Sequence, residues 1–104
     1  MLVNKSRLTA GDIVALKIVN GDEIIGKLIQ EDADSYEIER PCTVIPSQQG
    51  IGLMQSMFTV DPKITINISK AHVMMSAPVI PQMESHYIET TTGIKQMPKG
   101  SIIV

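Results

Sequence analysis

The chain has 104 residues, 43% of them apolar, which is enough for one modest domain with a hydrophobic core. Its net charge of −2 argues against a generally basic surface for polyanions, so any nucleic-acid site must be a local patch. The single cysteine, Cys42, excludes an intrachain disulfide and favours a reducing compartment. No apolar stretch is typical of a signal peptide, and none approaches the roughly 20 residues of a membrane-spanning helix. We therefore expect a soluble, cytoplasmic protein.

The first half of the chain predicts a β-hairpin. Residues 13–19 alternate in the manner of a half-buried strand, with three aliphatic side chains on one face. Asn20 and Gly21 follow directly and predict a type I′ turn, in which both central residues have positive φ angles. Residues 22–30 then form the returning strand. Gly26 lies in its middle, where a glycine permits a sharp bend or the close approach of another backbone.

The middle of the chain predicts further strands. Residues 36–45 form a third strand, in which Pro41 indicates an edge or a bulge because proline donates no ladder hydrogen bond. The remaining extended segments are expected at residues 51–60, 64–69 and 73–77. Aromatic residues make up only 3% of the chain, so we expect a core of aliphatic residues and methionine.

The last part of the chain predicts a short amphipathic helix at about residues 81–91. Pro81 suits a first helical turn and Gly93 suits a helix end. For residues 94–104, one more short strand and an arm reaching a neighbouring copy are both open. Short strands joined by tight turns, with a single helix, favour an all-β barrel over a βαβ fold.

Residues 14–32, VALKIVNGDEIIGKLIQED, resemble the first sequence motif of the Sm and Sm-like family of RNA-binding proteins. Besides alternating apolar residues, the matched positions are Asn20, Gly21, Glu23, Gly26 and Asp32, without a gap. Residues 64–78 resemble the region where that family runs strand, turn and strand. The overall layout, including PSQQGIGLMQ, is also similar to Sm-like proteins of tailed phages that infect cyanobacteria, which would place the protein in the host cytoplasm.

The resemblance implies a small, strongly bent five-stranded barrel with an extended region between strands three and four. The single domain would span residues 1–104, with a core at about 12–79 and a C-terminal extension over 80–104. In the family, outer strands of neighbouring subunits pair edge to edge and so close a ring. We therefore expect a homo-oligomeric ring of about five to seven identical subunits.

The resemblance also implies that two turns face the pore and bind single-stranded nucleic acid, RNA in preference to DNA. The turns correspond to residues 32–36 and 69–72, and the candidate binding residues are Tyr36, Ser69, Lys70 and His72. A tyrosine ring stacks on a base, a lysine contacts phosphate and a histidine hydrogen-bonds a base or sugar. Each has a structural alternative: a tyrosine packed on the core, an exposed turn lysine and a turn histidine bonded to backbone.

Other candidate sites are weaker. Asp32 and Asp34 lack the glycine and glutamate of a calcium loop, so we expect turn-forming carboxylates and no metal site. Four methionines are expected in the core or between subunits: Met54, Met57, Met74 and Met75. No motif supports catalysis or a cofactor, and Cys42 has no flanking signature of a nucleophile. We therefore expect no enzymatic activity.

Two functions stay open on the sequence. The first is a ring that binds single-stranded nucleic acid in its processing or regulation, favoured by the motif and by Lys70 and His72. The second is a structural or adaptor ring that binds proteins, favoured by the acidic composition and the scarcity of aromatic residues.

Overall fold

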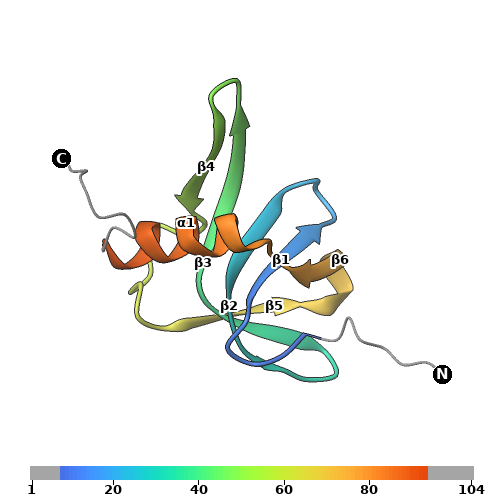
Figure 1. The fold of residues 1–104 in the computed structure, drawn as a ribbon. Coiled ribbons are helices and arrows are strands. Elements are labelled where there is room, and N and C mark those ends of the chain that lie inside the picture. Colours follow the sequence, from blue (N-terminus) through green and yellow to red (C-terminus); the bar gives the residue numbers. More distant parts are fainter. Residues whose placement is uncertain (1–7, 94–104) are drawn as a thin grey trace.

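The computed structural model describes residues 8–93, which form one antiparallel sheet of six strands followed by a helix (Figure 1). The strands are β1 (Ile13–Ile18), β2 (Glu23–Glu31), β3 (Ser35–Ser47), β4 (Gly50–Gln55), β5 (Thr65–Ser69) and β6 (Val73–Pro78). A short 3-10 turn, η1 (Lys70–His72), joins β5 to β6, and α1 (Pro81–Thr92) ends the described chain. The predicted β-rich architecture with one C-terminal helix is confirmed. Within residues 8–93, no helix has the length and apolar character needed to cross a membrane.

The long strand β3 has two partners along one edge. Its first part pairs with β5 and its second part with β4, while β2 lies along the other edge. β4 and β5 thus behave as one strand interrupted by residues 56–64. Six strands match the six extended segments expected from the sequence pattern, whereas the resemblance to the Sm-like family implied five. The predicted extended segment 51–60 accordingly ends at Gln55. In the described residues β6 pairs only with β1, so the sheet is not closed into a barrel.

The turn between β1 and β2 differs from the predicted type I′ turn. Gly21 has a φ of 95°, but Asn20 does not have a positive φ. The Gly21 N–H donates to the Ile18 carbonyl at 2.9 Å, and the Ile18 N–H donates to the Asp22 carbonyl at 2.9 Å. This is the arrangement of a three-residue loop in which a type I turn is followed by a left-handed glycine. Asn20 contributes through its side chain, whose Oδ1 accepts the Asp22 N–H at 3.0 Å.

β3 bends where Arg40 and Pro41 lie opposite Gly26 of β2. The pairing register skips two residues of β3 at this point, which makes a bulge. Arg40 takes a left-handed conformation with φ 53°, and Pro41 has no N–H to leave unpaired. The close approach expected at Gly26 is present, because a Cβ there would lie 2.3 Å from Ile38 Cγ2 and 3.2 Å from the Glu39 carbonyl oxygen.

The sheet buries side chains on both of its faces, as alternation along a strand dictates. One buried cluster consists of Val14, Leu16, Leu28, Tyr36 and Ile38. The second consists of Ile13, Ile25, Cys42 and Tyr87, the last from α1. Met54, Met57, Met74 and Met75 are all at least 42% exposed. Of the two positions expected for these methionines, the core of the single subunit is therefore wrong, and packing between subunits stays a prediction.

α1 is part of this packing and not a separate extension. It begins with Pro81 in its first turn and ends at Gly93, which caps the helix with a φ of 76°. Tyr87 is 3% exposed, and its hydroxyl donates to the Glu39 carbonyl at 2.6 Å. The predicted helix is therefore present, one residue longer than expected, and its Tyr87 packs against the face of the sheet that carries Ile13, Ile25 and Cys42. The alternatives for residues 94–104 lie outside the described residues.

Candidate functional site

The two turns expected to face a pore lie side by side at one end of the sheet. The β3–β5 register pairs Ser35 with Ser69, and the Lys70 N–H donates to the Asp34 carbonyl at 2.8 Å. The turn after β2 and the turn η1, which are far apart in the sequence, therefore form one continuous surface. We call this surface the turn cluster and define it by residues 31–36 and 69–72.

Lys70 is held at the centre of the turn cluster. Its Nζ donates to Glu31 Oε2 at 2.7 Å and lies 5.1 Å from the centroid of the Tyr36 ring. The hydrogen bond to Glu31 raises the pKa of Lys70, so the ammonium stays charged at neutral pH. About a third of each side chain is exposed, 30% for Lys70 and 33% for Glu31. Lys70 is thus accessible to a phosphate, but a bound phosphate would compete with Glu31.

Tyr36 does not present its ring to solvent. It is only 7% exposed and packs among Val14, Leu16 and Ile38. Its hydroxyl donates to Ser76 Oγ at 3.4 Å, and the Lys70 ammonium lies over the ring. In this geometry the ring supports the core and holds Lys70, so stacking on a base would require it to leave its position.

Ser69 and His72 occupy the two ends of η1. The Ser69 hydroxyl accepts the Ala71 N–H at 3.2 Å, which makes it the cap of this turn. The His72 carbonyl accepts the Val19 N–H at 2.9 Å, while its side chain is exposed. Of the four predicted binding residues, Ser69, Lys70 and His72 are accessible, the Ser69 hydroxyl being engaged in capping η1, and only Tyr36 is buried.

Asp32 organises the first turn of the cluster. Its Oδ1 accepts the N–H groups of Asp34 and Ser35, each at 2.9 Å. These backbone hydrogen bonds lower the pKa of Asp32, so the carboxylate stays ionised. This is the geometry of a turn-forming aspartate. Among residues 8–93 no group of three His, Cys, Asp or Glu side chains could hold a metal ion.

Glu31 is the residue that the sequence reasoning missed. It ends β2 and is set beside Lys70 only because β3 pairs with both β2 and β5. No local pattern identifies such a partner, since the two residues come from opposite halves of the chain. With Asp32 and Asp34 nearby, Glu31 makes the turn cluster of one subunit more acidic than basic.

Cys42 lies in the second buried cluster and is 3% exposed. Burial raises the pKa of its thiol, which disfavours the thiolate needed for nucleophilic chemistry.

Comparison with known proteins does not assign a family: no protein-family model and no curated protein matches this chain.

Proposed function

We propose that this protein forms a ring of identical Sm-like subunits and binds single-stranded nucleic acid at the turn cluster. The observation that carries the proposal is the contact between the two turns, which sets the Lys70 ammonium of η1 beside Glu31 and Tyr36, with the exposed His72 side chain two residues further along η1. In a ring each of these groups recurs once per subunit. Repetition sets one Lys70 ammonium per subunit along a single path for the phosphate backbone, with the carboxylates of Glu31, Asp32 and Asp34 recurring beside each of them.

Two free strand edges support the ring. β6 has a partner only on its β1 side, and β4 and β5 have a partner only on their β3 side, within the described chain. Exposed apolar side chains lie at both edges, including Met74 and Met75 on β6 and Ile51 and Met54 on β4. Unpaired edges with apolar flanks invite pairing with another copy, and head-to-tail pairing closes into a ring when the rotation permits.

We expect Ser76→Pro to separate the ring into monomers without unfolding the subunit. The β1–β6 register, together with the bond from the Val79 N–H to the Ile13 carbonyl, places the Ser76 N–H on the free edge of β6. Proline removes this outward donor and leaves the ladder to β1 intact. Light scattering should give a ring of about five to seven subunits for the parent and for the control Ser76→Ala, and a monomer for Ser76→Pro. A parent that is monomeric at micromolar concentration would refute the ring.

For the nucleic-acid site, we expect Lys70→Ala to weaken binding of labelled single-stranded oligonucleotides and Glu31→Gln to strengthen it. The first removes the ammonium, and the second frees it from its competing carboxylate. Lys70→Ala should also reduce the steepness of the plot of log affinity against log salt concentration. The slope should fall by about 0.7 for each phosphate that Lys70 neutralises in the parent. Titrations at two salt concentrations with oligo-U, oligo-A and single-stranded DNA measure both effects.

Lys63→Ala is the matched control for charge, because Lys63 is exposed but lies in the 56–64 loop, outside the turn cluster. It should bind like the parent. Equal losses of affinity from Lys63→Ala and Lys70→Ala would mean that only net charge matters.

The second candidate function is an adaptor ring that binds protein partners. It is favoured by Glu31, Asp32 and Asp34 around Lys70, which oppose an approaching phosphate backbone. A parent ring that binds no oligonucleotide at low salt would select this alternative.

A further inference from the structure

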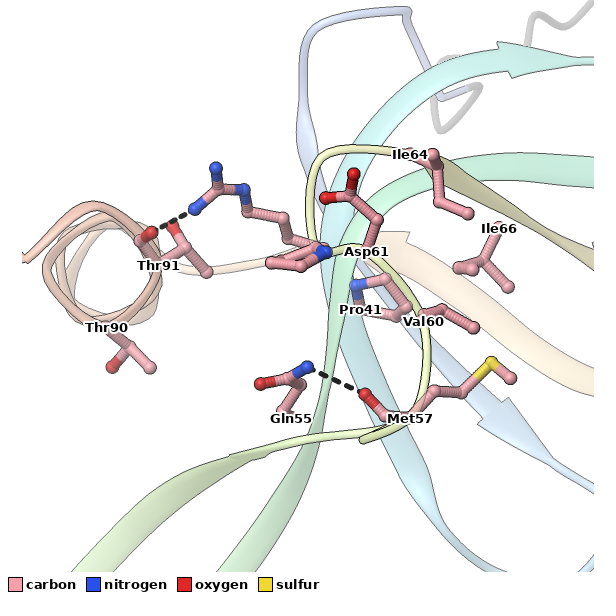
Figure 2. A pocket seen from close by; sticks show the side chains of 11 residues that line it. Pro41, Gln55, Met57, Val60, Asp61, Ile64, Ile66, Thr90 and Thr91 are labelled. Carbon is pink, nitrogen blue, oxygen red and sulfur yellow. Dashed lines mark hydrogen bonds between the residues drawn. The ribbon is translucent and has the colours of Figure 1, made fainter.

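An open cavity of about 280 Å³ lies between the bend of β3, the 56–64 loop and the last turn of α1 (Figure 2). Its apolar lining comes from Pro41, Met57, Val60, Pro62, Ile64 and Ile66. The volume corresponds to about nine water molecules at about 30 Å³ each, which is room for a small organic molecule. The cavity shares no residue with the turn cluster.

Two side chains of opposite charge line this cavity. Arg40 belongs to the bulge of β3, and the exposed Asp61 belongs to the 56–64 loop. The two groups do not pair with each other, because within residues 8–93 the one close ion pair joins Lys70 to Glu31. A cation and an anion that border one apolar cavity without pairing are both available to a ligand.

Both charged groups are fixed by the backbone and keep hydrogen-bonding capacity. Arg40 Nη1 donates to the Thr91 carbonyl in the last turn of α1, which leaves further N–H groups on the guanidinium. Asp61 Oδ1 accepts the Lys63 N–H at 2.9 Å, which leaves Oδ2 as an acceptor. Each group is therefore held in position by one contact and can make another.

The backbone of Arg40 is in a conformation that other residues adopt at less cost. Its φ of 53° lies in the left-handed region, which favours glycine and asparagine. Residues held there against their preference are concentrated at functional sites. Arg40 also borders a second cavity, lined by Lys27, Glu39 and Glu84 among others, and it pairs with neither carboxylate. An arginine at this bulge thus indicates a use for its guanidinium beyond the backbone turn.

The two charges restrict the ligand to one chemical class. An apolar carboxylate would bind Arg40 but be repelled by Asp61, and an apolar amine would meet the reverse. A zwitterion can place its carboxylate on the guanidinium and its ammonium on the Asp61 carboxylate. An apolar side chain on the same molecule would cover Met57 and Ile64, which are 42% and 49% exposed.

We propose that this cavity binds a free α-amino acid with an apolar side chain. Its carboxylate lies at Arg40, its ammonium at Asp61 and its side chain on the apolar lining. The inference goes beyond the proposed nucleic-acid function and is independent of it, because the two sites share no residue.

Methyl NMR of the full, methionine-labelled chain tests the proposal by titration with L-leucine and L-phenylalanine. Either amino acid should give a saturable shift of the Met57 methyl signal and leave Met74 and Met75, on β6, unchanged. Isocaproate, which is leucine without its ammonium, and isoamylamine, which is leucine without its carboxylate, should each bind about tenfold or more weakly than leucine.

Three results of this titration would overturn the proposal. The first is no shift of Met57 with millimolar concentrations of either amino acid. The second is equal affinity for leucine and its two analogues, which would indicate an apolar cavity without recognition of charge. The third is a shift of Met74 and Met75 together with Met57, which would indicate binding without a defined site.

Charge-removing variants test the roles of the two groups. Asp61→Asn keeps an oxygen for the Lys63 N–H, and it should weaken leucine by about tenfold or more while strengthening isocaproate, from which it removes a repulsion. Arg40→Asn, which suits the left-handed backbone, should weaken leucine and isocaproate and strengthen isoamylamine. Asp34→Asn is the control, since Asp34 is exposed and lies outside the cavity, and it should bind like the parent. Parallel losses for all three ligands in Asp61→Asn and in Arg40→Asn would refute the assigned contacts, because a purely structural role predicts that pattern.

Discussion

Replacing Tyr87 by alanine is expected to lower the free energy of unfolding by about 3–5 kcal/mol. Tyr87 is 3% exposed and packs α1 onto Ile13, Ile25 and Cys42 of the sheet. The substitution leaves a cavity and removes the hydrogen bond to the Glu39 carbonyl. Because small domains have total stabilities of about 5–15 kcal/mol, a loss of this size detaches the helix or unfolds the subunit.

Urea denaturation followed by circular dichroism measures the effect of Tyr87→Ala, at one fixed protein concentration because oligomers gain stability with concentration. Gln82→Ala is the control, since Gln82 lies on the exposed side of the same helix and should change stability by less than about 0.5 kcal/mol. Similar unfolding free energies for the two variants would show that α1 does not support the core.

Tyr87→Phe separates the hydroxyl from the ring and adds a dependence on pH. Burial raises the pKa of Tyr87 well above its ordinary value, so the folded state holds the phenolic proton more tightly than the unfolded state does. The contribution of Tyr87 to the stability of the parent should therefore be constant below about pH 10, the unfolded pKa, and fall as the pH rises above it. Tyr87→Phe should lack this part of the alkaline loss of stability. Denaturation between about pH 8 and pH 11 should therefore show the unfolding free energies of the two proteins converging as the pH rises.

Gly26→Ala is expected to cost about 1–3 kcal/mol, because it overpacks the bend of the sheet. The new Cβ would lie 2.3 Å from Ile38 Cγ2 and 3.3 Å from Pro41 Cα. Ile38 is fully buried and β-branched, so it has little freedom to move aside. For a domain of this size, each kcal/mol lowers the melting temperature by about 4–8 °C, which calorimetry or thermal denaturation resolves.

Two further variants make the test of Gly26 specific. Gly52→Ala is the control, because its Cβ would meet nothing closer than the Ile45 carbonyl oxygen at 3.8 Å and should leave stability nearly unchanged. Ile38→Leu removes the Cγ2 atom, so the double variant Gly26→Ala with Ile38→Leu should lose less than the sum of the single losses. Equal losses at Gly26 and Gly52 would mean that the cost is a general effect on strands and not the close approach.

Sequence patterns near one another along the chain predicted local structure well. The β1–β2 hairpin and the helix between Pro81 and Gly93 were expected and are present, and of the edge or bulge expected at Pro41 the structure has the bulge. Each depends on short-range chemistry: a glycine that accepts positive φ, a proline without an N–H, or apolar residues at helical spacing. The turn type was wrong because Asn20 and Gly21 are compatible with more than one loop length, and only hairpin pairing selects among them.

Long-range pairing decided the rest. The placement of β4 and β5 along the same edge of β3, the burial of Tyr36 and the ion pair of Glu31 with Lys70 all depend on β3 pairing with three other strands. The sequence by itself determined the strands and the positions of the turns between them. It also identified Lys70 and His72 as candidate binding residues. Only the tertiary structure decided which neighbours these side chains meet, because contacts between distant segments follow from the register of the whole sheet and leave no local signal in the chain.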